Sequence, residues 1–393
     1  MTPMITPTNT PAGTPTLIPI TSATLLDLLD RCQTIDLRCK GTTNHCPMLL
    51  AAACSLGADA SMLHALHQNW VQHYALPLTR TEASIRFQDI GVFQGQTRHF
   101  ASIRAAILKE MQNGDNADVA HKLLRAFPPA PLTLAFHAVI RLAYALRTDH
   151  AGEIASGLAA LICGYLPTGI DTTSLAYCSS PAEGFRGLSS ALKGRVFKGR
   201  MITEKLRAVL SDPLFLNHCP QLREPGRQLA ALRELALKLY AQTRNFTALH
   251  LITGLHAWRT LITFEPALNH RALAQELWLA CCAAYASIGA PALTGAQPLT
   301  QSAQSTRSAP YKRAPIFAIS DVEASWQVVI KNALVSQNDH QIKLAHACFE
   351  EFQLNGEKDY LSVLMTRAQV ERANKQTALS GRAHKPLPQP PAN

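Results

Sequence analysis

The chain has 393 residues, of which 47% are hydrophobic and 16% are charged. This low charged fraction excludes an intrinsically disordered chain as a whole, and the length suffices for one large core or two ordinary ones. Aromatic residues make up only 6%, and Ala and Leu dominate over β-branched runs, which argues against an all-β fold. Lys and Arg number 37 against 27 for Asp and Glu, but they are spread thinly, so we expect no nucleic-acid partner.

Both ends of the chain and one inner stretch lack a helical pattern. Residues 1–22 are rich in Thr and Pro and have neither a basic start nor a continuous apolar run, which predicts a disordered tail and not a signal peptide. Residues 373–393 are predicted to form a second disordered tail, and residues 289–314, rich in Ser, Gln, Thr and Pro, a long loop. The sequence therefore predicts a single domain over residues 23–372.

Within this domain the apolar residues recur at helical spacing, and alternating strand patterns are almost absent. Thr21 and Ser22 are candidate N-caps for the first helix. No stretch reaches about 18 uninterrupted apolar residues, so we expect no membrane span. The fold class predicted is all-α, with helices surrounding a buried, histidine-rich metal site. In chain order, helices are expected from Leu25 onward and over residues 48–57, 62–74, 136–146, 154–166, 229–240, 246–262, 273–288, 322–334 and 342–352.

The ten cysteines are scattered, and no CxxC pair occurs. Several lie inside apolar helical patterns, such as Cys163 and the Cys281–Cys282 pair. This distribution is typical of reduced, buried thiols in a cytoplasmic protein and not of a disulfide framework.

Five of the fifteen histidines lie in or beside apolar helical segments. One such histidine alone is usually a hydrogen-bonded core residue, but several on separate helices favour a metal site. The chain has no HExxH motif, so a metalloprotease is not supported. The five are His45, His137, His250, His256 and His340.

Two of these histidines, His250 and His256, are six residues apart and therefore about 120° apart on an ideal helix. Gly254 between them would have to distort the helix to bring both inward. Without that distortion, only one of the two is a metal ligand.

Lys343 lies among apolar residues, where burial would lower its pKa and favour the neutral amine. A neutral amine can react with carbon dioxide to give a carbamate, which is an anionic oxygen ligand. The alternative is a lysine at a helix edge that reaches water.

Several short segments, in this order and spacing, resemble the questin oxidase-like family, whose members act on fungal aromatic polyketides. The resemblance covers residues 25–370, while the Pro/Thr-rich head and the 289–314 loop match poorly. The segments that carry it are Asn44-His45, Pro47-Met48, Leu56-Gly57-Ala58, Phe136-His137, Ile140-Arg141, Ala143-Tyr144-Ala145, Tyr165-Leu166-Pro167, Phe246 to His250, Thr253-Gly254, His256-Ala257, Asp339-His340 and Ile342-Lys343-Leu344.

This resemblance implies an all-helical oxygenase with a mononuclear non-haem iron held by four histidines and, in at least one relative, a carboxylated lysine. The matching positions are the five histidines named above, one of which would not be a ligand, with Lys343 as the carbamate. His346 is left out, because the family usually has another residue there. Fe(II) and O2 are the expected cofactors, and an aromatic small molecule the expected partner.

Two residues on the helix that begins near His137 are expected to contact this substrate. Arg141 would face a phenolate or carboxylate, unless it forms a salt bridge between helices. Tyr144 would donate to a quinone oxygen, unless it belongs to the core. With Lys343, they are the candidate catalytic residues.

NADPH is used by some relatives, but no GxGxxG follows a strand here, so reducing equivalents would come from a partner or the substrate. Two alternatives stay open: a zinc site, structural or hydrolytic, and a non-catalytic helical protein that binds small molecules. The sequence indicates no oligomeric state.

Overall fold

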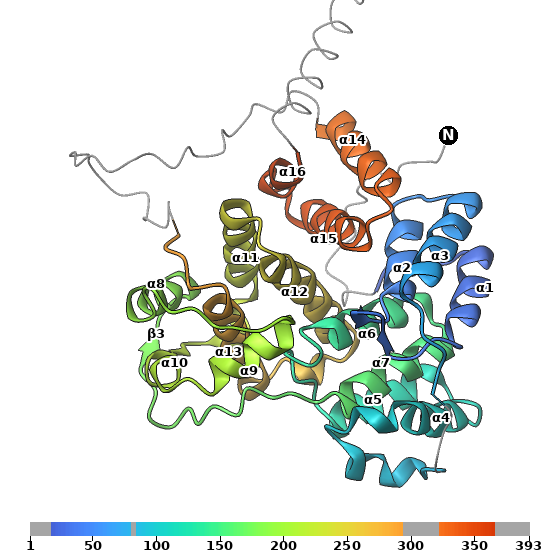
Figure 1. Ribbon diagram of the computed structural model, residues 1–393, viewed down its shortest axis with the longest axis horizontal. Coiled ribbons are helices and arrows are strands. Elements are labelled where there is room, and N and C mark those ends of the chain that lie inside the picture. The colour runs from blue at the N-terminus through green and yellow to red at the C-terminus, as the bar shows by residue number, and fades with distance from the viewer. Residues whose placement is uncertain (1–16, 80–83, 294–321, 366–393) are drawn as a thin grey trace, which may run out of the picture.

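Helices make up nearly all the regular structure of residues 17–79, 84–293 and 322–365, which this computed structural model describes (Figure 1). The first half contains α1 (Ala23–Cys32), α2 (Cys46–Ser55), α3 (Ala60–Tyr74), η1 (Phe87–Phe93), η2 (Thr97–His99), α4 (Phe100–Met111), α5 (Asn116–Ala126), α6 (His137–Thr148), α7 (Ala151–Cys163) and α8 (Pro181–Ala191). The second half contains α9 (Ile202–Leu210), α10 (Pro213–His218), η3 (Pro225–Arg227), α11 (Leu229–Thr243), α12 (Phe246–Phe264), η4 (Pro266–Leu268), α13 (Arg271–Ser287), α14 (Val322–Val335), α15 (Asp339–Asn355) and α16 (Asp359–Leu364).

The strands of the described residues are two residues long. An antiparallel pair joins β1 (Arg38–Cys39) to β2 (Thr42–Thr43), and a parallel pair joins β3 (Tyr177–Cys178) to β4 (Gln221–Leu222). The prediction of a single, all-α domain is therefore confirmed.

The ten predicted helices correspond to α1–α3, α6, α7 and α11–α15. Ser22 caps α1 as expected, since its hydroxyl accepts a hydrogen bond from the backbone N–H of Leu25. The helix predicted to run to Leu166 ends at Cys163, with Gly164 as its C-cap. Helices α4, α5, α8, α9, α10 and α16 were not predicted. Among these, α5 carries a readable start signal, because Asp115 caps the N–H groups of Ala117 and Asp118.

Four helices from distant parts of the sequence meet at the centre of the molecule. Helix α6 packs on α12 and α2, and α15 packs on both α2 and α12. In Figure 1, α12 and α15 lie between α1–α3 on one side and α8, α10 and α13 on the other. Helix α12 is buried almost continuously from Thr247 to Leu261, as expected of a helix that is apolar all round.

Residues 17–22, predicted to lie in the N-terminal tail, instead pack against the end of α6. Ile20 is buried, and its backbone N–H donates to the carbonyl oxygen of Arg147, whose Nε donates to the carbonyl oxygen of Ile18. Because these contacts bury apolar surface, this segment belongs to the helical domain. Residues 1–16, 294–314 and 373–393, the rest of the predicted tails and most of the predicted loop, lie outside the described residues.

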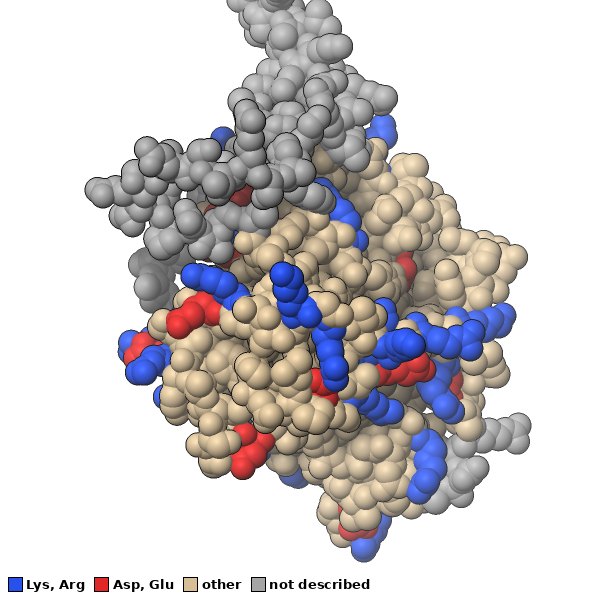
Figure 2. Space-filling view, turned by 60° about the vertical axis from the view of Figure 1, so that its left-hand side comes forward, with Lys and Arg blue, Asp and Glu red and all other residues tan. Residues whose placement is uncertain are grey.

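Within the described ranges, no helix combines the length and apolar character that a membrane crossing needs. On the face drawn in Figure 2, Lys and Arg side chains alternate with Asp and Glu and with uncharged surface.

Candidate metal centre

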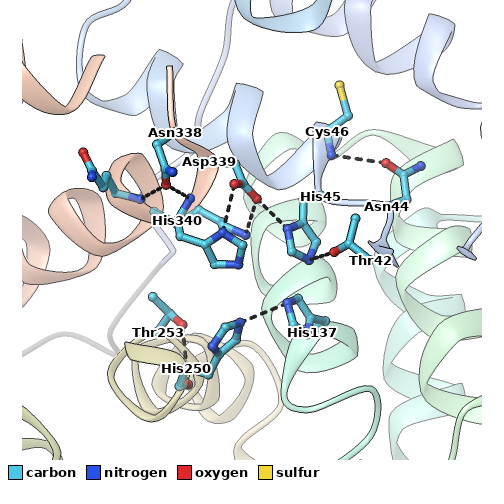
Figure 3. A network of polar contacts seen from close by, with 12 residues as sticks. Thr42, Asn44, His45, Cys46, His137, His250, Thr253, Asn338, Asp339 and His340 are labelled. Carbon is cyan, nitrogen blue, oxygen red and sulfur yellow. Dashed lines mark hydrogen bonds and ion pairs between the residues drawn. The ribbon is translucent and has the colours of Figure 1, made fainter. Parts of the chain in front are cut away.

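Four imidazoles converge where the N-terminal ends of four helices meet (Figure 3). His45 is the N-cap residue of α2, and His137 is the first residue of α6. His250 lies in the second turn of α12, and His340 is the second residue of α15. The positive ends of four helix dipoles thus lie near the cluster, which favours a neighbouring anion such as the carboxylate of Asp339 and disfavours protonated imidazoles.

The rings lie within direct contact of one another. His45 stacks on His137 with ring centroids 4.4 Å apart and planes 14° apart, and it meets His340 edge-on at 4.9 Å. One ring nitrogen from each of these three residues lies within 4.8 Å of the other two. The Nε2 atom of His250 lies 3.1 Å from Nε2 of His137.

Hydrogen bonds on the outer side of each ring fix where its proton sits. The Nδ1 atom of His137 lies 2.6 Å from the carbonyl oxygen of Leu134, and that of His250 lies 2.7 Å from the carbonyl oxygen of Phe246. Because a carbonyl oxygen can only accept, both Nδ1 atoms must carry the proton. Their Nε2 atoms therefore present lone pairs to each other at 3.1 Å, an arrangement that is repulsive unless a cation or a proton lies between them.

A carboxylate fixes the proton positions of the other two imidazoles in the same way. The Nδ1 atoms of His45 and His340 donate to Oδ2 and Oδ1 of Asp339, at 2.5 and 2.9 Å. Nε2 of His45 is left to accept from the hydroxyl of Thr42 at 3.2 Å. Nε2 of His340 is buried with no hydrogen-bond partner among the described residues.

The electrostatics keep the imidazoles neutral. Burial, together with the charge of Lys343, lowers the pKa of His45 to about 3. Burial also lowers the pKa values of His137 and His250 to well below 6.5, and that of His340 to a lesser degree. The neutral imidazoles of His137, His250 and His340 have Nε2 lone pairs that no protein donor occupies, and Nε2 of His45 would exchange its contact with Thr42 for a metal. Such a donor set, oriented by outer acceptors, fits a divalent transition metal such as iron or zinc.

Asp339, for which the sequence predicted no role, links the cluster to Lys343. Its Oδ2 lies 3.4 Å from Nζ of Lys343, whose side chain is buried. Burial lowers the pKa of Lys343, although the carboxylate opposes this shift. Burial opposes ionisation of Asp339 too, but Lys343 and the hydrogen bonds from His340 and His45 hold its pKa far below the usual range.

An unusual turn delivers His137 to the cluster. The three residues before it, Leu134, Ala135 and Phe136, have φ angles of 52°, 54° and 70°. Each costs roughly 1–2 kcal/mol, because the Cβ atom crowds the following carbonyl group in this region. This strain directs the carbonyl oxygen of Leu134 back to the His137 ring, and such strain is typical of functional sites.

His256 lies in a second polar cluster, further along the same helices. Its Nε2 lies 2.6 Å from Oε2 of Glu350, whose Oε1 lies 3.2 Å from Nε2 of His346. Arg147 pairs with both carboxylate oxygens, and the hydroxyl of Tyr144 lies 2.9 Å from Nδ1 of His346. His256, His346 and Glu350 are close enough to share a metal, but the carboxylate is already saturated by donors. We therefore read this cluster as a satisfied hydrogen-bond network.

The two clusters form successive layers in one bundle. Tyr144 follows His137 by seven residues, His256 follows His250 by six, and Glu350 follows Lys343 by seven. At 1.5 Å per residue, the layers are about 9–10 Å apart along the helix axes. The distortion at Gly254 that would have brought His256 inward does not occur, because α12 is one continuous helix there.

Arg141 lies in a third network. Its Nε and Nη2 atoms each lie 3.0 Å from an oxygen of Glu153. Both side chains are buried, so this is the interhelical salt bridge that the sequence left open as an alternative to substrate contact.

A surface depression lined by α5 residues, among them His121 and Arg125, lies away from the imidazoles. His121 and Arg125 contact Glu265, the C-cap residue of α12, which follows His250 by fifteen residues and so lies about 20 Å away along the helix axis. This depression does not serve the metal centre.

Comparison with known proteins agrees with this architecture. A profile of the family described as Questin oxidase-like matches residues 42–348, a range that includes His45, His137, His250, His340 and Lys343. A search of curated proteins finds no match. The profile covers well over half of the chain, and membership of this family indicates an oxidoreductase. The chain belongs to the questin oxidase-like family.

Proposed function

We propose that this chain is an oxygenase that uses one non-haem Fe(II) and O2 to insert oxygen into, or cleave a ring of, an aromatic polyketide-like substrate. The observation that supports a bound metal is that the Nε2 atoms of His137 and His250 lie 3.1 Å apart with their lone pairs facing each other. Their protons are committed to backbone carbonyl groups, and burial disfavours a second proton on either ring. A cation between them removes the repulsion.

The Nε2 atoms of His45, His137, His250 and His340 would hold the iron, with an oxygen of carboxylated Lys343 as a fifth ligand. Imidazole and anionic oxygen donors suit iron, and five donors leave one octahedral position open. Iron bound there would supply the means to activate O2 against an electron-rich ring. Asp339 would keep the tautomers of His45 and His340 fixed while they bind.

The surroundings of Lys343 support its carboxylation. In the neutral amine, Nζ forms a bond to the carbon of CO2 and loses one proton, which gives a carbamate anion. Burial of Nζ favours the neutral amine that this step requires. The carbamate would lie beside the carboxylate of Asp339, and the bound cation and the N-terminus of α15 would offset the repulsion between the two anions.

Phe246 supports an aromatic substrate. It is the first residue of α12, and its side chain is 51% exposed. Its ring centroid lies 4.6 Å from those of both His250 and His340. An aromatic ring stacked on Phe246 would therefore lie next to the metal ligands.

Two of the residues expected to contact substrate have their polar groups engaged elsewhere, Arg141 with Glu153 and Tyr144 with His346. Phe246 and the imidazole layer would therefore recognise the substrate. Reducing equivalents, if the reaction needs them, would come from the substrate or from a separate protein.

Elemental analysis of untagged protein purified without chelators tests the proposal. We expect about one iron per chain, lost in His137→Ala and kept in His64→Ala, a control on the exposed face of α3. Lys343→Ala should bind iron more weakly. Protein grown with isotope-labelled CO2 should show a carbamate carbon signal that is lost in Lys343→Arg.

Oxygen consumption with an anthraquinone as probe substrate then tests the reaction. We expect uptake that depends on both iron and the anthraquinone. Zinc instead of iron, lost in His137→Ala, would retain the site and overturn the oxygenase assignment. A folded native protein without metal would overturn both, and would leave a helical small-molecule-binding protein.

A further inference from the structure

A second group of metal-binding side chains lies where the first three helices pack together. Cys32 is the last residue of α1, Cys46 is the first residue of α2, and His67 lies in the middle of α3. The two Sγ atoms and one ring nitrogen of His67 all lie within 4.8 Å of one another. The three donors thus come from three separate helices and point at one small volume.

The two thiols of this group are enclosed and His67 is partly buried, and the group is short of hydrogen-bond partners. Cys32 and Cys46 are both 0% exposed, and their thiols pair only weakly with each other. Nε2 of His67 is shielded from solvent and has no hydrogen-bond partner within the described part of the chain. An enclosed, unpaired ring nitrogen costs about 1–3 kcal/mol, which makes this group unlike the saturated His256–His346–Glu350 network.

The donor set selects a particular class of cation. Two thiolates and an imidazole are soft to borderline ligands, which prefer zinc and copper(I) to magnesium or calcium. Two thiolates also neutralise the charge of Zn²⁺, so a buried complex would carry no net charge. With Cu⁺, three donors of this kind complete a trigonal site.

We propose that Cys32, Cys46 and His67 bind a thiophilic d¹⁰ cation, zinc(II) or copper(I), at a site separate from the imidazole centre. The two sites share a turn of the chain, because Cys46 directly follows His45. In Figure 3 the sulfur of Cys46 points away from the four imidazoles. A cation bound by Cys46 would tie α1 and α3 to the turn that carries His45, and this site does not depend on the oxygenase assignment.

Cobalt(II) titration of the full-length, metal-free, reduced protein tests the site. Cobalt bound by Cys32 and Cys46 gives a near-ultraviolet thiolate-to-cobalt charge-transfer band, which the sulfur-free imidazole centre cannot give. Displacement of cobalt by Zn²⁺ would identify zinc as the preferred ion, and displacement by Cu⁺ alone would identify copper. In either case, we expect alkylation to be blocked at Cys32 and Cys46 when the metal is bound, as mapped by mass spectrometry.

Matched variants identify the residues that give rise to the charge-transfer band. Cys32→Ser and His67→Gln should lose it. Cys163→Ser should keep it, since Cys163 is equally buried but lies on α7, and so should His64→Gln on the exposed face of α3. If Cys32→Ser does not fold, the alkylation map of the unaltered protein still shows whether metal protects Cys32 and Cys46.

Three results would overturn the proposal. These are a folded protein that gives no thiolate band with cobalt, a band that persists in folded Cys32→Ser, and a Cys32–Cys46 disulfide in protein isolated without air.

Discussion

Gly254 of α12 faces the ring of Phe136, so that a Cβ atom added at position 254 would lie 2.7 Å from Cδ1 and 3.0 Å from Cγ of that ring. Phe136 is the last of the three residues in the left-handed turn before His137. The close approach of these two residues lets the turn hold His137 against His250. Gly254→Ala should displace this turn, lower the free energy of unfolding by about 1–3 kcal/mol and weaken metal binding, as measured by urea unfolding and chelator competition.

Gly187→Ala is the matched control. Gly187 lies within α8, and an added Cβ atom there meets no heavy atom within 4 Å. Because alanine favours the helix, this change should be neutral or stabilise by up to about 1 kcal/mol. Equal effects of the two substitutions would contradict the role given to Gly254.

Asp339→Asn should weaken metal binding roughly 10- to 100-fold. The carboxylate accepts from Nδ1 of both His45 and His340, and an amide supplies only one accepting oxygen. One of the two rings would then lose its fixed tautomer. Chelator competition measures the affinity, and Asp27→Asn, in an exposed pair with Arg31, should leave it unchanged.

His250→Ala and His256→Ala separate the two polar layers of α12. The first change removes an inward Nε2 and should abolish stoichiometric iron. The second removes a partner of Glu350 and should cost about 1–3 kcal/mol of stability while the metal is retained. Metal loss in a fully folded His256→Ala protein would place His256 in the metal centre instead.

The sequence could identify the histidines but not divide them between these layers. The sequence singles out His45, His137, His250 and His340 because a polar ring in an apolar helical segment is costly to bury unless it has a partner. A spacing of six residues from His250, however, does not determine which way the His256 side chain points. Its partner Glu350 on α15 shows that it points into the second cluster. Helical spacing also could not separate the two uses proposed for Arg141, because its partner Glu153 lies on the next helix.

The backbone of the site was the least predictable part. The turn before His137 consists of Leu134, Ala135 and Phe136, residue types that do not favour positive φ. The sequence therefore gives no signal that predicts this turn. Gly254 was expected to be a point of helix distortion, whereas its missing side chain leaves room for Phe136 in the turn before α6. Asp339 had a local signal, since it precedes His340 and lies four residues before Lys343.

Phe246→Ala should raise KM for an anthraquinone substrate about two- to tenfold, because one aromatic contact is lost. Since the ring is half-exposed and Nδ1 of His250 bonds to the backbone of residue 246, metal content and kcat should change little. Phe246→Trp keeps an aromatic face and should keep KM. Steady-state oxygen uptake gives both constants, and a fall in kcat at constant KM would argue against substrate contact at Phe246.

The stability of the metal-free protein should fall as the pH drops from about 6.5 toward 3. Burial lowers the pKa of His45 from 6.5 to about 3 in the folded state. Between these values the unfolded chain binds a proton that the folded protein does not, so the free energy of unfolding decreases with falling pH. His137, His250 and His340 shift in the same direction, and each adds up to about 1.4 kcal/mol per pH unit. Urea unfolding at a series of pH values measures the slope, which His137→Gln should reduce and His64→Gln should not. A flat profile below pH 6.5 would show that the imidazoles take up protons as readily in the folded protein as in the unfolded chain, and would remove the lone-pair argument for a metal.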